Sequence, residues 1–169
     1  METKWQIFVT PFNRITGRCN ERIYECSSNF AWNLTSKEIK KEIWDDQTQN
    51  HNLNGIHIHC PEGSTPKNGP SAGTAITTTI YSLLNNKKIK HNIAITGEIT
   101  LDGNVTEIGG LDLKFLGGIK AGVTEFLFPK ENQKDYDSFI KKHKDDELTK
   151  NIKFNTVETI EDVFKLVFE

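Results

Sequence analysis

The chain has 169 residues, a mass of 19.2 kDa and a formal charge of −2, which suits one ordinary domain with its own buried core. A sequence pI near 6.2 excludes a broad basic surface, so neither nucleic acid nor a membrane is expected as a partner. The three cysteines form no C-x-x-C pair, and the sequence has no signal-peptide layout and no membrane-spanning run. These features predict an intracellular protein in a reducing compartment, not a secreted one.

The first part of the chain combines strand-like and helical patterns. Residues 4–10 and 22–27 have the β-branched and aromatic content of strands, and the turn-rich segment between them predicts an opening hairpin. A capping-box pattern from Thr35 to Glu38 predicts a short amphipathic helix. Residues 56–60 alternate like a strand, and the turn-forming sequence PEGSTPKNGP separates them from a helical pattern that starts near Ser71 and ends near Asn85 or Asn86.

The second part of the chain alternates between the two patterns. Asp102-Gly103 is a hairpin signal between the strand-like segments 91–101 and 104–108. The remaining predicted elements are a helix at 111–120, a strand at 124–128, a helix at 132–144, a strand at 151–155 and a helix from about 160. Hairpins favour antiparallel pairing, whereas strands interleaved with helices favour parallel pairing, so the predicted class is mixed α/β (α+β).

The segment PKNGPSAG at 66–73 raises a question about its serine, which could be a helix cap or a nucleophile. Gly69 to Gly73 satisfy the G-x-S-x-G pattern, but a nucleophile elbow needs a strand that leads directly into the turn, and a long loop precedes Ser71. A catalytic Ser71 would need a base. His57, His59, His91 and His143 are the histidine candidates; the first two share one strand face, and no third residue has metal-ligand spacing.

A lysine base is the other option, because serine-lysine pairs are a known variant of the triad. The amine must then be neutral, which requires burial or nearby positive charge, since an unperturbed lysine has a pKa of about 10.4. Most lysines lie in polar runs, but the helical neighbours of Lys114 include Leu111, Gly117 and Gly118, so another part of the protein could cover it. The alternative is a lysine that extends to solvent from a helix edge. The N–H groups at the start of the Ser71 helix would favour an oxyanion.

Three long motifs in register resemble the proteolytic domain of Lon protease, a serine-lysine peptidase: HIHCPEGSTPKNGPSAG (57–73), AITGEITLDGNVTEIGGLDLKFLGGIKAG (94–122) and FPKEN (128–132). The resemblance implies that Ser71 is the nucleophile, that Lys114 is the general base and that Thr96 orients the lysine amine by a hydrogen bond. It also implies a Lon-type fold with mixed parallel and antiparallel sheets. The other residues that it places at the site as supporting elements are His57, His59, Asn68, Gly69, Pro70 and Ala72.

The resemblance divides the expected single domain, residues 1–169, into three parts. Residues 1–50 match poorly and form a divergent hairpin and helix, residues 55–132 form the core with the serine and the lysine, and residues 133–169 form a strand and helices. Asn68 stands where the family usually has aspartate, and Asp112 stands where it usually has lysine. The first change removes a charge close to the nucleophile.

The resemblance also implies what the protein acts on and with. Lon proteins normally carry a ring-forming ATPase in the same chain, but no G-x-x-x-x-G-K-[ST] motif occurs in this sequence. The expected activity is therefore an ATP-independent serine endopeptidase acting on unfolded polypeptides, with no metal or organic cofactor, and with ATP used only through an ATPase domain or partner. Family members form six-membered rings, which implies a homo-oligomer. The rival hypothesis is a Lon-like binding or assembly module without catalysis.

Overall fold

The fold is described from a computed structural model that covers residues 6–10, 14–16, 55–59, 69–144 and 146–169, with side chains described from residue 69 onward except at positions 145 and 148. The predicted strand at 22–27 and the predicted helix that begins at Thr35 lie outside these residues. The part of the chain that carries the serine and the lysine lies within them.

The N-terminal strands form a three-stranded sheet in the order β1-β3-β2. β1 (Gln6–Thr10) pairs antiparallel with β3 (Gly55–His59), and β2 (Arg14–Thr16) pairs parallel with the other edge of β3. The strands predicted at 4–10 and 56–60 are confirmed. The assignment of residues 14–16 to a turn-rich connection is wrong, because they form an edge strand whose partner is distant in sequence, which local turn signals do not reveal.

A parallel sheet with the order β4-β7-β8 is the centre of the described part of the molecule. It consists of β4 (Ile93–Ile95), β7 (Glu125–Pro129) and β8 (Lys153–Val157), and β7 pairs with both neighbours. The middle strand, EFLFP, is apolar and buried along almost its whole length, as expected for a parallel strand that is covered on both faces.

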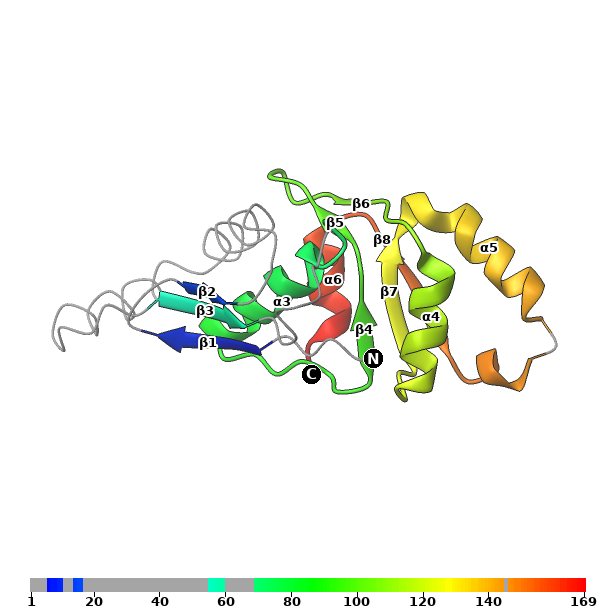
Figure 1. The fold of residues 1–169 in the computed structure, drawn as a ribbon, viewed down its shortest axis with the longest axis horizontal. Coiled ribbons are helices and arrows are strands. Elements are labelled where there is room, and N and C mark those ends of the chain that lie inside the picture. The colour runs from blue at the N-terminus through cyan, green and yellow to red at the C-terminus, as the bar shows by residue number, and fades with distance from the viewer. Residues whose placement is uncertain (1–5, 11–13, 17–54, 60–68, 145) are drawn as a thin grey trace, which may run out of the picture.

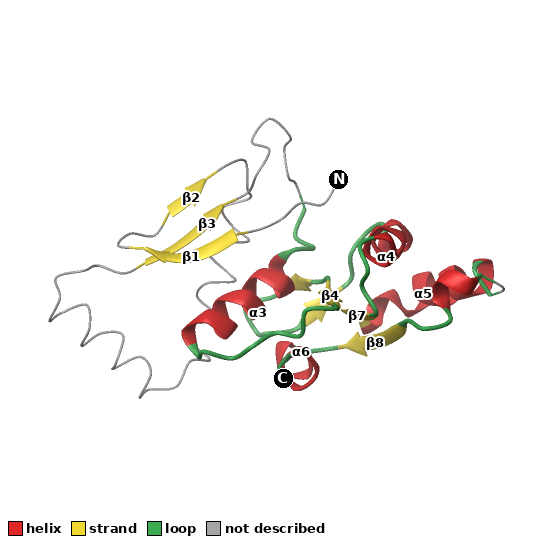
Figure 2. Cartoon of the chain, turned by 90° about the horizontal axis from the view of Figure 1, so that it is seen from below, coloured by secondary structure: helices red, strands yellow, loops and turns green. Residues whose placement is uncertain are grey.

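Helices cover both faces of this sheet (Figures 1 and 2). α4 (Leu111–Lys120) and α5 (Gln133–Lys142) lie on one face, and α6 (Ile160–Val167) lies on the other, with α3 (Gly73–Leu84) beside it. The four helices confirm the helical segments predicted from residue 71 onward. Together with the two kinds of strand pairing, they confirm the predicted mixed α/β class.

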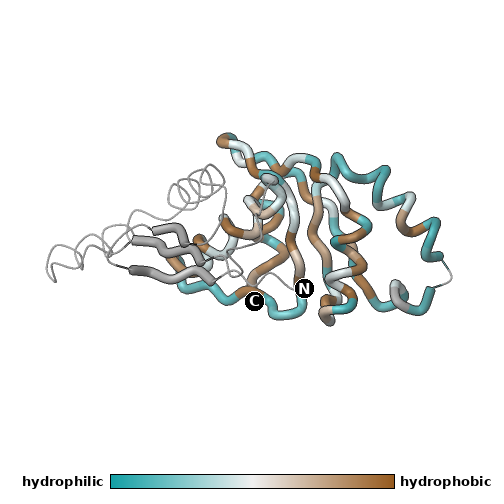
Figure 3. Tube along the Cα trace, viewed as in Figure 1, coloured by the Kyte–Doolittle hydropathy of each residue, from teal (hydrophilic) through white to brown (hydrophobic). Residues whose placement is uncertain are grey.

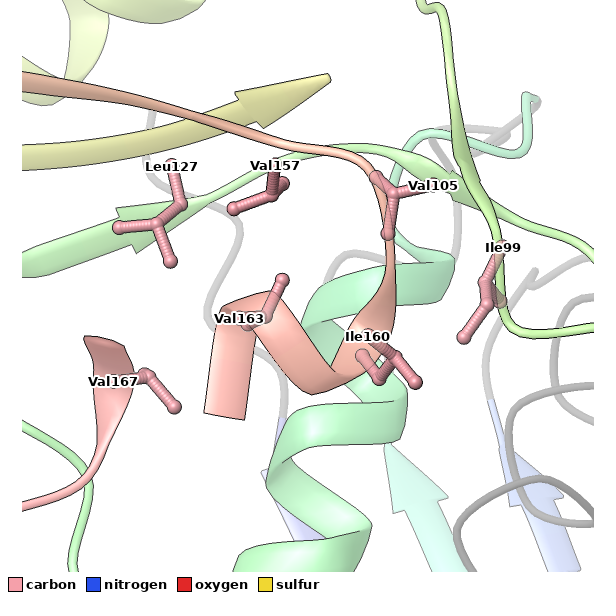
Figure 4. Packing of buried hydrophobic residues seen from close by; sticks show 7 residues of the cluster. All are labelled: Ile99, Val105, Leu127, Val157, Ile160, Val163 and Val167. Atoms are coloured by element: carbon pink, nitrogen blue, oxygen red, sulfur yellow. The ribbon is translucent and has the colours of Figure 1, made fainter. Parts of the chain in front are cut away.

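Successive residues of β7 contribute their side chains to two separate hydrophobic clusters, because neighbouring side chains on a strand point to opposite faces. Leu127 belongs to the cluster on the α6 side, which Figure 4 shows in close-up. Phe126 and Phe128 belong to the cluster on the α4 and α5 side, and both rings pack edge-on against the fully buried Phe115 of α4. The apolar colour along β4 and most of β7 in Figure 3 marks the interior that these clusters fill.

A short hairpin follows β4. β5 (Glu98–Ile99) and β6 (Val105–Thr106) pair antiparallel across the turn that contains Asp102-Gly103, which confirms the predicted hairpin. The segment 91–101 is not one continuous strand, however. The chain leaves the parallel sheet after Ile95 and enters the hairpin at Glu98, so Thr96 and Gly97 form a corner between two sheets.

Candidate active site

Ser71 lies in a tight turn immediately before α3. Gly69 has φ of 106°, which favours glycine, and the N–H of Gly73 donates to the carbonyl of Pro70 at 3.0 Å. Ala72, not Ser71, occupies the N-cap position of α3, and no side chain caps the helix. The helix-cap explanation for Ser71 is therefore not supported, and its hydroxyl is available for another contact.

That contact is with Lys114. The Nζ atom of Lys114 donates to the Oγ atom of Ser71 at 3.1 Å, although the two residues are 43 positions apart in the sequence. Lys114 projects from the first turns of α4, and its own N–H donates to the carbonyl of Gly110 at 3.2 Å. The structure thus brings a hydroxyl and an amine from two different elements within hydrogen-bond distance.

The surroundings of Lys114 decide between the two options left open, a covered lysine and one that extends to solvent. The lysine is exposed to solvent in the described structure. Gly118 packs against β7 instead, because a Cβ atom there would lie 2.5 Å from Cε1 of Phe126, and Gly117 faces open space. Gly118 therefore brings α4 close to the sheet, and neither glycine buries the amine.

The corner between β4 and β5 binds the backbone of Ser71. The carbonyl of Ser71 accepts hydrogen bonds from the N–H of Gly97 at 3.0 Å and from the hydroxyl of Thr96 at 3.2 Å. The bond expected between Thr96 and the lysine amine is not formed among the described residues. Thr96 therefore contacts the backbone of Ser71 and not the amine of Lys114.

Thr74 completes this connection from the α3 side. Its N–H and its hydroxyl both donate to the carbonyl of Gly97, at 3.2 Å and 2.9 Å, and the residue is fully buried. The turn before α3 and the corner at Gly97 are thus joined by hydrogen bonds in both directions. This pairing fixes the backbone on either side of the Ser71 side chain.

Gly97 is a site residue that the sequence analysis missed. A Cβ atom at this position would lie 2.5 Å from Cγ1 of Val105 and 2.8 Å from Oγ1 of Thr74, so only glycine lets the two backbones approach. A glycine inside a strand-like segment often marks such an approach. The signal was therefore present in TGEI, but its partner was not identifiable from sequence.

The remaining predicted site residues are only partly placed. Pro70 is exposed beside Gly69 in the turn before Ser71. His57 and His59 lie two positions apart on β3, with register partners on β1 and β2, and their side chains are outside the described residues, as is Asn68. Among the described residues, no group of three or more His, Cys, Asp or Glu side chains could hold a metal ion. In the same residues, no helix is long and apolar enough to cross a membrane.

Comparison with known proteins identifies the family of this chain. The family model of the Lon protease (S16) C-terminal proteolytic domain matches residues 11–169, which includes most of the region that resembled the family only weakly. The Lon protease of Fusobacterium nucleatum is 45% identical over 128 residues, which cover 76% of this chain and 15% of that protein. The Lon protease of Solibacter usitatus is 37% identical over 155 residues, covering 92% of this chain and 18% of that protein.

A third relative has a higher sequence identity over a shorter segment. The Lon protease of Clostridium acetobutylicum is 55% identical over 80 residues, covering 47% of this chain and 10% of that protein. The chain therefore spans less than a fifth of the length of these relatives. A serine and a lysine of the expected motifs are hydrogen-bonded to each other. The family model matches almost the whole sequence, which shows that the chain belongs to the Lon protease C-terminal proteolytic domain family.

Proposed function

We propose that this chain is a serine endopeptidase module that hydrolyses peptide bonds in unfolded polypeptides, with Ser71 as nucleophile and Lys114 as general base. The contact of 3.1 Å between Lys114 Nζ and Ser71 Oγ is the observation that carries the proposal. A nucleophile and its base must lie within about 2.6–3.2 Å of each other. The hydrogen bonds from Thr96 and Gly97 to the Ser71 carbonyl support it, because they hold the nucleophile in a fixed backbone position.

In the proposed reaction, the neutral amine of Lys114 takes the proton of the Ser71 hydroxyl as Oγ forms a bond to the carbonyl carbon of the substrate. The resulting ammonium returns this proton to the leaving amine as the peptide C–N bond breaks, which leaves an ester on Ser71. Lys114 then takes a proton from water, the hydroxide attacks the ester, and Ser71 regains its proton when the acid product leaves. No oxidant, metal or nucleotide enters this sequence of steps.

The tetrahedral intermediates carry a negative oxygen, which backbone N–H groups can stabilise. The N–H groups of Gly73 and Thr74 are already bonded to the carbonyls of Pro70 and Gly97. Among the described residues, those of Ser71 and Ala72 have no acceptor. We therefore assign the oxyanion contacts to Ser71 and Ala72, at the N-terminal end of α3, where the helix dipole also favours negative charge.

The exposure of Lys114 bears on when the proposed site works. A protonated amine cannot accept the serine proton, and removing water from an amine favours its neutral form. An extended substrate chain laid over the turn and α4 would remove that water. We propose that the bound substrate itself excludes water from the Lys114 amine. In this proposal the chain works within a ring of identical subunits, and an ATPase domain or subunit supplies the unfolded chains.

The test is the cleavage of an unfolded protein such as casein, without ATP, by the wild-type chain and by Ser71→Ala and Lys114→Ala. Lys120→Ala is the matched control, because it removes an exposed lysine from the same helix. Cleavage by the wild type and Lys120→Ala, with a loss of at least about 10³-fold in the other two variants, would support the proposal. Cleavage that survives in Lys114→Ala would refute the role of the lysine. Absence of cleavage by the wild type at concentrations that favour a ring would support the binding-module alternative.

A further inference from the structure

Asn132 lies at the start of α5, yet it contacts a segment far away in sequence. Its Oδ1 atom accepts from the N–H of Ile108 at 3.0 Å, and its Nδ2 atom donates to the carbonyl of the same residue at 2.9 Å. The amide also donates to Oδ2 of Asp135 at 2.7 Å. Asn132 is only 2% exposed, so these bonds form away from water and its amide satisfies both backbone groups of Ile108.

Helix capping does not account for this residue. Asparagine at the N-cap position normally accepts a hydrogen bond from an N–H in the first turn. Asn132 occupies that position in α5, but no side chain caps this helix. Thr159 shows the ordinary arrangement in the same protein, because it caps α6 and accepts from the N–H of Asp162. The side chain of Asn132 is bonded to Ile108 instead.

The preceding residue acts on the same segment. Oε2 of Glu131 accepts from the N–H of Glu107 at 2.8 Å, so two successive side chains bind two successive backbone positions. The segment that they bind leads directly into α4 through Gly110, whose φ is 69° and which has no side-chain cap bond. The start of the helix that carries Lys114 is therefore fixed from the start of α5, and Figure 1 shows the connection from β6 to α4 passing beside that end of α5.

The nucleophile side of the site is attached to the same strand that leads to Asn132. The N–H of Thr96 donates to the carbonyl of Leu127 in β7 at 3.0 Å, and Thr96 in turn bonds to the carbonyl of Ser71. The 3₁₀ turn Lys130–Asn132 follows β7 directly. One continuous segment, from β7 to the end of this turn, thus contacts the corner that holds Ser71 and the segment that starts the helix of Lys114.

We propose that Asn132, with Glu131 beside it, is a positioning residue that sets the distance between Lys114 and Ser71. The inference rests on the proposed peptidase function, which it deepens. It acts through backbone placement, because Asn132 contacts the segment before α4 and has no bond to the reacting atoms. A shift of about 1 Å in a catalytic group can reduce the rate about 10²-fold, so such placement matters for catalysis.

Two pairs of variants test this role in the full chain. Asn132→Leu removes the amide at similar volume, and Asn151→Leu makes the same replacement at an exposed position as a control. Because Asn132 is buried, the exposed Glu131 provides a second pair that leaves the core intact. Glu131→Ala removes the acceptor for Glu107, whereas Glu131→Gln keeps an oxygen that can accept the same bond.

The first readout is steady-state cleavage of a short peptide, well below the melting temperature of each variant. We expect kcat to fall at least about 10-fold in Asn132→Leu and about 3-fold in Glu131→Ala, with KM within about 2-fold of wild type. Glu131→Gln and Asn151→Leu should retain wild-type kcat. A purely structural role would lower activity only in proportion to the unfolded fraction, and kcat would then be normal for the folded protein.

The second readout does not need activity. The NMR signal of the Lys114 Cε–Hε group is recorded with and without Ser71→Ala, first in the wild-type background and then in Asn132→Leu. We expect Ser71→Ala to shift the signal in the first background and to have at most about half that effect in the second, because the two side chains no longer meet. An equal shift in both backgrounds, or unchanged kcat in folded Asn132→Leu, would overturn the inference. An inactive wild-type chain would refute the proposed function alone, and the NMR comparison would still decide the role of Asn132.

Discussion

Substitution of Gly97 by alanine should disrupt the connection between the two halves of the site. The added Cβ would lie 2.5 Å from Cγ1 of Val105, 2.8 Å from Oγ1 of Thr74 and 3.5 Å from Cγ of Pro129. Val105 and Thr74 are both buried in the core, so neither can move aside without displacing its own neighbours. The backbone of the corner has to move instead.

The expected loss can be worked from these contacts. Overpacking of a well-packed interior by one methyl group costs about 1–3 kcal/mol. Displacement of Thr74 also weakens the 2.9 Å bond from its hydroxyl to the Gly97 carbonyl, and a typical intramolecular hydrogen bond contributes about 1 kcal/mol. We therefore expect Gly97→Ala to lower the free energy of unfolding by about 2–4 kcal/mol.

Urea unfolding followed by far-UV circular dichroism measures this loss as a lower midpoint at an unchanged m-value. Gly117→Ala is the control, because its Cβ meets nothing within 4 Å and alanine is favoured over glycine in a helix by about 1 kcal/mol. The control should be as stable as wild type or more stable. If Gly97→Ala unfolds at the wild-type midpoint, the corner at Gly97 is not as closely packed as described and the reasoning fails.

Two further predictions concern the core and the last helix. Phe115→Ala should lower the free energy of unfolding by about 3–5 kcal/mol in the same assay, because Phe115 is fully buried against five aromatic rings. A decrease of less than about 1 kcal/mol would contradict its central place in that cluster. Hydrogen bonding from Lys165, followed by that from Thr159, lowers the pKa of Asp162 below its usual value. Its stabilising contribution is therefore present above about pH 4 and is lost as the pH falls through the lower folded pKa. Asp162→Asn should make unfolding midpoints fall less steeply between pH 5 and pH 2, and an unchanged slope would refute this assignment.

The sequence predicted the second half of the chain well because its elements are local. The helix predicted at 111–120 has the same bounds in the structure. The Asp102-Gly103 turn signal placed the hairpin correctly. The strand at 14–16 was missed because three residues carry little signal and their partner strand starts at Gly55. Local patterns do not encode which distant strand provides the hydrogen bonds.

The sequence predicted which residues form the candidate site better than it predicted the contacts that they make. Ser71 and Lys114 were identified from motifs, and the structure places them in contact. Of the two options left open for Lys114, the structure shows the lysine that extends to solvent, and Gly118 on the same helix packs against Phe126. The bond of Thr96 to Ser71 depends on the corner between two sheets, and within 91–101 only Gly97 signals that corner, without identifying its partner.

The attachment of Ser71 and Lys114 to separate elements also has a consequence for the chain during its synthesis. A nascent chain that has just exposed Ser71 has neither Lys114, the proposed base, nor the strand β7, to which the Thr96 corner is bonded. The hydroxyl of such a chain is an ordinary alcohol, since activation of serine requires its base. We therefore expect the proposed peptidase activity to be absent from the emerging polypeptide until the parallel sheet has closed.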